Sequence, residues 1–165
     1  MRILWPLLLL CIAACAPAGP VALPPPLTAD FVLVDKSDRT LTLYRGAQQI
    51  VAYGDLAFGD APFGHKRFEG DERTPEGRYT IDTRNPDSAY HLSLRISYPN
   101  AADRELAASV GGDPGGDIFI HGQPNWLRVG TMPGDWTDGC IAVTNAEMEQ
   151  LWRLIPDGTP IEIRP

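Results

Sequence analysis

Two short stretches decide how this chain is interpreted: DIFIHG at residues 117–122 and WTDGCI at residues 136–141. The first is an apolar run typical of a buried strand, and it ends on His121 followed by Gly122. The second carries Cys140, nineteen positions after the histidine. The two side chains are therefore candidates for one chemical site.

A thiol and an imidazole suit acyl transfer when they lie close together. The thiolate is the attacking form, and an ordinary thiol pKa near ~8.5 leaves only a few per cent ionised at neutral pH. An imidazole at His121 can take the proton from Cys140. Gly139 permits a tight backbone whose N–H groups can face a tetrahedral oxyanion, and Gly122 lets substrate or another chain approach closely. The pattern indicates a nucleophile and its base.

Two other interpretations fit the same residues. A single cysteine is often a small buried hydrophobe without chemistry. Cys140 could also join His65, His91 and His121 as metal ligands, but no pair of them has the short spacing of a metal site. His91 falls in an alternating stretch, which predicts a structural role, and His65 lies in a loop, which predicts solvation. We expect no metal and no cofactor.

The N-terminus has the pattern of an export signal over residues 1–14. One basic residue precedes an uncharged apolar run that is too short to span a bilayer. The run ends in IAAC at residues 12–15, which resembles a bacterial lipoprotein cleavage box, where Cys15 becomes the lipid-modified N-terminus. Ordinary signal cleavage near Ala16 or Ala18 is the alternative.

Residues 15–29 form the predicted spacer after the lipidated cysteine. Its part after Cys15 has five prolines and no charge, a composition that favours extended polyproline geometry and builds no core. A single acyl chain gives only weak membrane binding, but bacterial lipoproteins carry more than one. Alanine rather than aspartate after Cys15 is compatible with sorting to the outer membrane. The prediction is an exported periplasmic protein, lipid-anchored to the outer membrane, with one folded domain over residues 30–165.

The net charge limits the classes of binding partner, and the number of cysteines limits the roles of Cys140. Without Arg2 the chain has 21 acidic and 13 basic residues, a net charge of −8. This argues against nucleic acid or an anionic membrane as a partner of a basic face. Cys11 leaves with the signal and Cys15 takes the lipid, so Cys140 remains as a lone thiol that is either inert or reactive. We expect a monomer.

The folded part is predicted to be mainly β with one or two short helices. Thr144 and Glu147 fit a capping box, and an apolar face follows at helical spacing up to Ile155. A weaker helix is expected at residues 103–110. The expected strands cover residues 31–34, 40–44, 49–53, 78–81, 91–96, 117–121 and 160–163.

At this point the sequence resembles the L,D-transpeptidase catalytic domain family, the YkuD type, and its small exported murein-enzyme branch. The family motif is a His-Gly pair, a spacer and Ser/Thr-x-Gly-Cys, which here is HG at residues 121–122 and TDGC at residues 137–140. TPEGRY at residues 74–79 is similar to the family's Thr-Pro-x-Gly-aromatic segment. The resemblance covers residues 31–163.

The resemblance implies a β-sandwich-like fold with the cysteine and histidine in a cleft under a flexible lid. The enzyme would take the acyl group of a peptidoglycan stem tetrapeptide, release D-alanine and pass the acyl group to an amine. Cys140 would be the nucleophile and His121 the general base and acid. A carbonyl near Gly122 would orient the imidazole. The N–H groups of Gly139 and Cys140, with the Thr137 hydroxyl, would form the oxyanion site.

The chain departs from the common family pattern at two positions. Asp138 stands where many members have histidine, and Ala142 where many have arginine or asparagine. An arginine at the second position is a natural clamp for a substrate carboxylate. Arg95, Arg128 and Lys66 are candidates to replace it, and the sequence does not choose among them.

Asp138 has two possible roles. An unpaired carboxylate two residues from Cys140 disfavours the thiolate, whereas a carboxylate that holds His121 supports catalysis. We favour the second role.

Two other functions share the motif: a hydrolase in which water replaces the amine (a murein L,D-carboxypeptidase or endopeptidase), and a non-catalytic, lipid-anchored wall-binding module.

Overall fold

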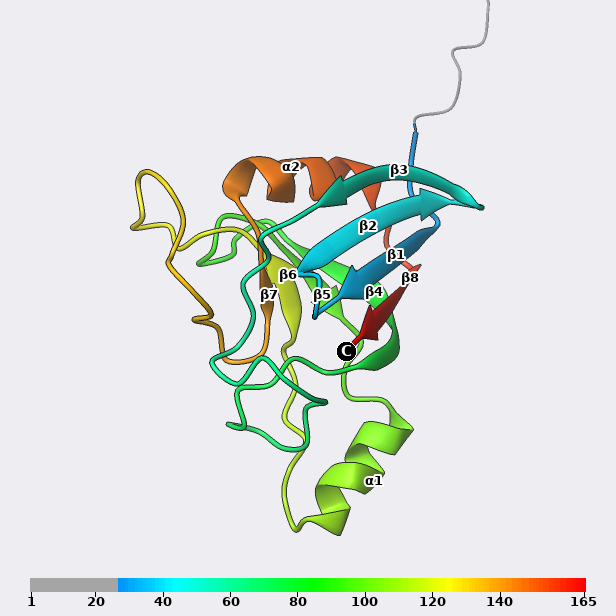
Figure 1. The fold of residues 1–165 in the computed structure, drawn as a ribbon, viewed down its shortest axis with the longest axis vertical. Helices are drawn as coiled ribbons and strands as arrows, with labels where there is room; N and C mark the ends of the chain where they lie inside the picture. The colour runs from blue at the N-terminus through cyan, green and yellow to red at the C-terminus, as the bar shows by residue number, and fades with distance from the viewer. Residues whose placement is uncertain (1–26) are drawn as a thin grey trace, which may run out of the picture.

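The computed structural model describes residues 27–165 of the chain (Figure 1). The signal peptide at 1–14, Cys15 and most of the 15–29 spacer lie outside the described residues, so these features stay predictions. Within the described part, no helix has both the length and the apolar character needed to cross a membrane.

Strands dominate the domain, as the sequence predicts. They form one curled eight-stranded sheet with the order β3-β2-β1-β8-β4-β5-β6-β7, accompanied by two short helices (Figure 1). The strands are β1 (Phe31–Asp35), β2 (Thr40–Arg45), β3 (Gln48–Tyr53), β4 (Gly77–Asn85), β5 (Ser93–Ile96), β6 (Phe119–His121), β7 (Ile141–Ala142) and β8 (Thr159–Arg164).

The alternation of apolar residues sets the register at the centre of the sheet. Val32 and Val34 of β1 pair with Leu43 and Leu41 of the antiparallel β2, and all four side chains are fully buried. Because neighbouring residues of a strand point to opposite faces, this register turns one face of the sheet into the core. Burying each such side chain contributes about 1.5–3 kcal/mol to stability.

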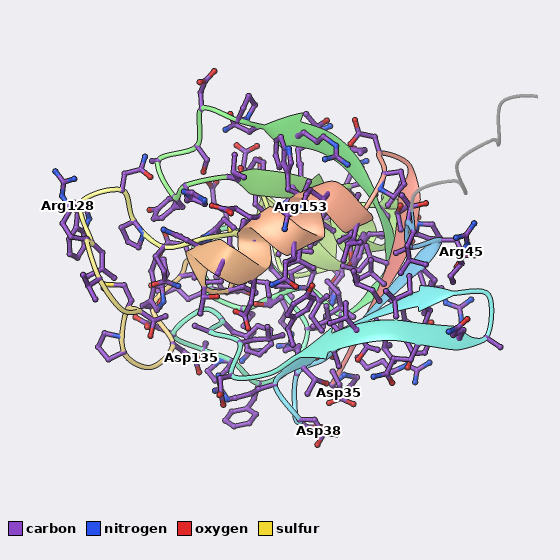
Figure 2. The ribbon with its side chains drawn as sticks, turned by 90° about the horizontal axis from the view of Figure 1, so that it is seen from above. Asp35, Asp38, Arg45, Arg128, Asp135 and Arg153 are labelled. Atoms are coloured by element: carbon purple, nitrogen blue, oxygen red, sulfur yellow. The ribbon has the colours of Figure 1, made fainter. Side chains whose placement is uncertain are left out.

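Helix α2 (Asn145–Leu154) covers one face of the sheet, where it contacts β5 and β6 (Figures 1 and 2). Its predicted capping box is present: Glu147 N–H donates to Thr144 Oγ1 at 3.2 Å, and Thr144 N–H donates to the Glu147 carboxylate at 2.9 Å. Its side chains Met148 and Leu151 are fully buried. The helix therefore braces the strand that ends on the histidine.

Helix α1 (Ala101–Ser109) lies at the opposite end of the domain from α2 (Figure 1). It begins two residues before the predicted start because Asn100 caps it, accepting a hydrogen bond from Asp103 N–H at 3.1 Å. The Asp103 side chain is buried and also accepts the Tyr79 hydroxyl at 3.1 Å. One carboxylate therefore joins the helix start to β4.

The prediction that His65 is solvated is wrong. Its Nδ1 accepts the Glu76 N–H at 2.9 Å, so its Nε2 carries the proton and donates to Asp103 at 3.2 Å. Nδ1 thus holds the loop between β3 and β4 to itself, and Nε2 ties that loop to helix α1. A lone histidine in a polar loop gives no sign of such long-range partners.

The strands near the His-Gly and Gly-Cys pairs also differ in their ends from the prediction. Strand β5 begins at Ser93 because His91 has φ = 67°, which is outside strand geometry. Strand β6 begins at Phe119, since Asp117 also has a positive φ of 54°. The two-residue strand β7 was not predicted, and it lies parallel to β6 at the edge of the sheet.

Candidate active site

The pairing of β6 with β7 brings the cysteine and histidine to one face. Ile120 lies opposite Ile141 and His121 opposite Ala142, so Cys140 lies level with Phe119. Because side chains alternate along a strand, Cys140 and His121 are diagonal neighbours on the face away from the buried Ile120. The structure therefore places the two predicted residues side by side.

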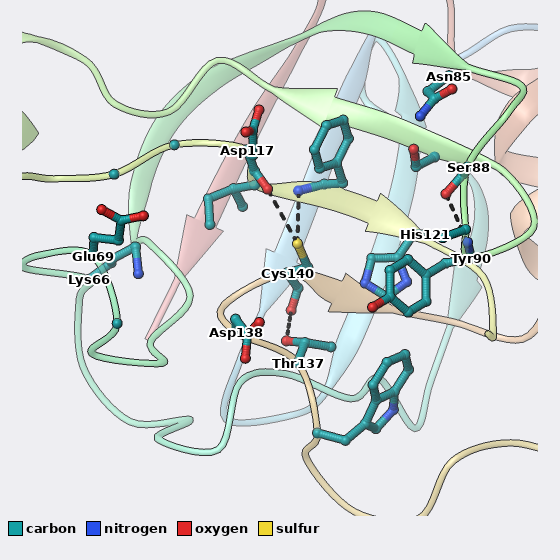
Figure 3. A pocket seen from close by; sticks show the side chains of 18 residues that line it. Lys66, Glu69, Asn85, Ser88, Tyr90, Asp117, His121, Thr137, Asp138 and Cys140 are labelled. Carbon is teal, nitrogen blue, oxygen red and sulfur yellow. Dashed lines mark hydrogen bonds between the residues drawn. The ribbon is translucent and has the colours of Figure 1, made fainter.

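Both side chains open onto a cavity of about 580 Å³. Figure 3 shows the cysteine between two ends of different character. One end is polar and aromatic, and the other is charged. The polar end includes Asn85, Ser88, Tyr90, Ser93, His121 and Trp136, and the charged end includes Lys66, Glu69, Asp117 and Asp138.

The imidazole of His121 is held as a neutral base. Its Nδ1 donates to the Gly122 carbonyl oxygen at 2.7 Å, which assigns the proton to Nδ1 and leaves Nε2 as an acceptor. Among residues 27–165, no hydrogen bond to Nε2 is recorded. Burial lowers the pKa of His121, and the Gly122 carbonyl opposes this only in part. A neutral imidazole with a free Nε2 is the form that accepts a proton.

Two aromatic rings enclose the imidazole. Tyr90 lies 4.6 Å from the His121 ring, measured between centroids, and Trp136 lies 5.5 Å away and edge-on. They restrict the orientation of the histidine beyond its single hydrogen bond. Trp136 adjoins the Gly-Cys motif in sequence, but nothing in the sequence points to Tyr90.

The thiol of Cys140 rests in its protonated form. It donates to the Asp117 carbonyl oxygen at 3.5 Å and accepts the Phe119 N–H at 3.4 Å. Burial raises the pKa of Cys140 to about 11; the Phe119 hydrogen bond and the charge of Lys66 oppose the rise, whereas the charge of Asp138 adds to it. No hydrogen bond between this thiol and His121 is recorded in the described part. For His121 to accept the thiol proton, that proton has to turn from the Asp117 carbonyl toward the imidazole.

The turn before Cys140 is tightly packed. Gly139 has φ = 117°, and a Cβ there would lie 2.5 Å from the Arg73 carbonyl oxygen. The Thr137 hydroxyl donates to the Cys140 carbonyl at 2.8 Å and accepts the Gly139 N–H at 3.2 Å. The hydroxyl proton is thus engaged within the turn, whereas no acceptor for the Cys140 N–H is recorded among the described residues.

Gly122 is also required by close contacts. Its N–H donates to the Tyr90 carbonyl at 3.1 Å, and a Cβ would lie 2.5 Å from Asn145 Oδ1. The same Asn145 oxygen accepts the Gln123 N–H at 2.7 Å. The start of α2 therefore fixes the backbone that orients His121.

Asp138 is exposed at the charged end of the cavity, beside Cys140 (Figure 3). Within the described chain no hydrogen bond from it to His121 is recorded. The imidazole is oriented by the Gly122 carbonyl instead. This geometry favours the alternative that we considered weaker from sequence, in which the carboxylate acts on the thiol.

The three candidate cations for a substrate carboxylate lie in different places. Arg95 is bound to Asp82 at 2.9 and 3.0 Å and does not line the cavity. Arg128 is exposed on a peripheral loop (Figure 2). Lys66 is buried and lines the cavity. Among the described residues, no group of three or more His, Cys, Asp or Glu is arranged to hold a metal ion.

Comparison with known proteins agrees with this geometry. The profile of the YkuD family, the L,D-transpeptidase catalytic domain, matches residues 29–163. The Escherichia coli K12 protein named "Putative L,D-transpeptidase YafK" is 28% identical over 130 residues, which cover 76% of this chain and 46% of the relative.

Two solved structures are similar to this chain in both sequence and fold. The helical cell shape determining protein Pgp2 of Campylobacter jejuni has a TM-score of 0.66 at 28% identity, covering 82% of this chain and 47% of that one. Bd1075 of Bdellovibrio bacteriovorus has a TM-score of 0.56 at 29% identity, covering 83% and 48%. This chain spans about half the length of these relatives. With the profile matching nearly the whole described domain, the chain belongs to the L,D-transpeptidase catalytic domain family.

Proposed function

We propose that this protein is a cysteine L,D-transpeptidase that forms an acyl-enzyme with a peptidoglycan stem tetrapeptide. The observation that carries the proposal is the shared cavity of Cys140 and His121, with Nε2 of the imidazole free of protein partners in the described domain. Family membership supports the reaction type and the substrate class.

In the acylation step, His121 Nε2 takes the thiol proton and the Cys140 sulfur attacks the carbonyl carbon between the third and fourth stem residues. The Cys140 N–H, which has no recorded acceptor among the described residues, is the donor best placed for the oxyanion. The Gly139 N–H can join it on leaving its long bond to Thr137. The tetrahedral intermediate then expels D-alanine, whose amine takes the proton from His121, and a thioester remains.

In the second step an amine attacks the thioester, loses its proton to His121, and releases the sulfur as a thiol. Water in place of the amine gives a shortened stem, so the hydrolase function shares every residue of the first step. Mass analysis of purified disaccharide-tetrapeptide after incubation separates these outcomes. We expect cross-linked dimers with the wild type and unchanged substrate with Cys140→Ser. Shortened stems alone identify a hydrolase, and unchanged substrate with the wild type contradicts the proposal.

The location of the enzyme is also a proposal. We infer an exported, periplasmic, lipid-anchored protein from the N-terminal pattern around Cys15, with sorting to the outer membrane. A role in cell shape is the corresponding proposal from the similarity to Pgp2. Cys15→Ala should move the protein from the membrane fraction to the soluble fraction after export. A wild-type protein that is already soluble contradicts the anchor.

A further inference from the structure

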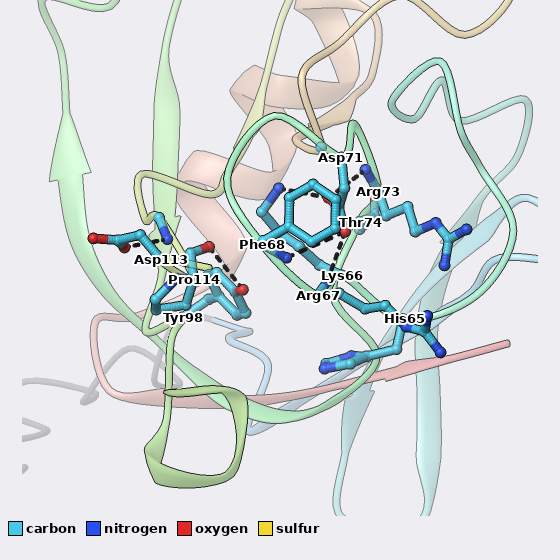
Figure 4. Close-up of polar contacts among 12 residues, drawn as sticks. His65, Lys66, Arg67, Phe68, Asp71, Arg73, Thr74, Tyr98, Asp113 and Pro114 are labelled. Atoms are coloured by element: carbon cyan, nitrogen blue, oxygen red, sulfur yellow. Dashed lines mark hydrogen bonds and ion pairs between the residues drawn. The ribbon is translucent and has the colours of Figure 1, made fainter. Parts of the chain in front are cut away.

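Lys66 is an unusual residue in the wall of the active-site cavity. It is only 3% exposed, yet it lines the space next to Cys140 (Figure 3). A lysine ammonium has three N–H donors. Within residues 27–165, the one recorded hydrogen bond of this ammonium goes to Asp71 at 3.0 Å (Figure 4). Two donors of a buried charge thus have no partner among residues 27–165.

Asp71 has hydrogen-bond donors besides Lys66. Its carboxylate accepts the backbone N–H groups of Arg67 at 2.6 Å, Arg73 at 3.2 Å and Phe68 at 3.4 Å (Figure 4). Burial acts to raise the pKa of Asp71, but the hydrogen bonds from Arg67, Lys66 and Arg73 outweigh it and lower the pKa. Asp71 therefore shapes the turn and is also the counter-ion of Lys66, and this ion pair uses one of the three donors of the ammonium.

The buried Lys36, in the turn after β1, shows what a structural lysine looks like when it packs against the loop that carries Lys66. Its ammonium donates to the carbonyls of Gly64 at 2.7 Å and Thr74 at 3.2 Å, and to Glu76 at 2.7 Å. All three donors are used within the protein. The spare donors of Lys66 are therefore a property of its place at the cavity and not of buried lysines in this domain.

The charges around the cavity make the position of Lys66 decisive for an anionic ligand. Among the described residues that line the cavity, Lys66 carries the one permanent positive charge, whereas Glu69, Asp117 and Asp138 are acidic. No ion pair joins Lys66 to these three acids in the described chain. A ligand carboxylate is repelled by most of this end and is attracted at one point.

We propose that Lys66 is the specificity residue that binds a carboxylate of the donor stem peptide. This inference rests on the proposed function. It assigns to Lys66 the clamp that the family resemblance places two residues after the cysteine, where this chain has Ala142. Two carboxylates of a stem can supply the chemistry: the C-terminal carboxylate of the leaving residue, and the free carboxylate of the acidic residue upstream of the bond that breaks.

The test compares three tetrapeptide stems: one with both carboxylates free, one amidated at the C-terminus, and one amidated at the upstream acidic residue. The full-length protein in detergent is assayed for release of the fourth residue, as kcat/KM. The variants are Lys66→Met and the matched control Arg95→Met, whose charge lies outside the cavity. If Lys66→Met does not fold, Lys66→Met/Asp71→Asn removes the pair and leaves neither charge alone.

We expect the wild type and Arg95→Met to prefer the free stem over one of the amides by about tenfold or more, the range of a lost charge-assisted hydrogen bond. Lys66→Met should reduce that ratio to about one, and the amide that matters identifies the carboxylate. An unchanged ratio in Lys66→Met, with all three stems slowed equally, overturns the clamp. So does a wild type that prefers neither carboxylate. A wild type that releases no product from any stem contradicts the proposed function itself, and the clamp with it.

Discussion

Two histidines in this domain are fixed at one ring nitrogen by the backbone, and they differ at the other. His65 accepts a backbone N–H at Nδ1 and donates from Nε2 to the buried Asp103. His121 donates from Nδ1 to the Gly122 carbonyl, and no partner of its Nε2 is recorded in the described domain. Both are ordered, but only the second has a nitrogen left for a substrate or a neighbouring thiol.

The two buried lysines repeat the contrast. Lys36 uses its three donors within the loop region, whereas Lys66 uses one at the cavity wall. A saturated polar group stabilises the fold, and breaking its contacts leaves a costly unpaired partner. A polar group that is positioned but unsaturated stabilises less and is available for chemistry. This difference separates the structural region from the candidate active site.

The histidine pair offers the largest test of the contrast. His121→Asn should lower the rate of D-alanine release by about 10²–10⁴-fold, the usual contribution of a general base. His65→Asn should change that rate by only a few-fold and should lower the melting temperature, because the contacts of both ring nitrogens are lost. Steady-state kinetics and thermal unfolding of both variants measure this. Equal losses of activity in the two variants contradict the contrast.

Glycine substitutions test how tightly the turn before Cys140 is packed. Gly139→Ala should lower the free energy of unfolding by about 3 kcal/mol or more, because the new Cβ meets the Arg73 carbonyl and the φ of 117° suits glycine. Gly134→Ala is the matched control. Gly134 also has a positive φ, but open space surrounds its Cβ position, so a cost of about 1 kcal/mol is expected. Denaturant unfolding compares them, and similar costs argue against the tight turn.

The smallest expected effect concerns Asp138. Its carboxylate contributes to the raised pKa of Cys140, so Asp138→Asn should lower that pKa and move thiol reactivity to lower pH. Coulomb's law at the dielectric constant of water predicts that the midpoint moves down by about 0.4 pH unit or more. The midpoint of alkylation of Cys140 by iodoacetamide against pH measures it, with Cys15 replaced. A reduced maximal rate of turnover without any shift of the midpoint restores the orienting role.

Much of the fold was predictable because local sequence patterns determine it. The capping box of α2 and the alternation in β1 and β2 each specify an element from a few neighbouring residues. Strand β7 has two residues and thus no period to detect. The positive φ of His91 and of Asp117 was not predicted, because neither residue is a glycine.

The candidate site follows the same division. The His-Gly and Gly-Cys pairs identify Cys140 and His121 because their spacing matches a family motif. Other features of the site depend on loops that meet only in the folded chain. These are the contact of Tyr90 with His121, the Asp117 carbonyl that accepts the thiol proton, and the position of Lys66, rather than Arg95 or Arg128, in the cavity wall. Such contacts join residues that are distant in sequence, and no local pattern encodes them.

The most direct measurement of the central claim is the release of D-alanine from a stem tetrapeptide by the wild type and by Cys140→Ser. The change is nearly isosteric, so the variant should unfold at a similar temperature to the wild type. We predict release by the wild type and none above background by the folded Cys140→Ser protein. Full activity in Cys140→Ser, or no release by the folded wild type, contradicts the assignment of Cys140 as the nucleophile of an acyl-transfer site.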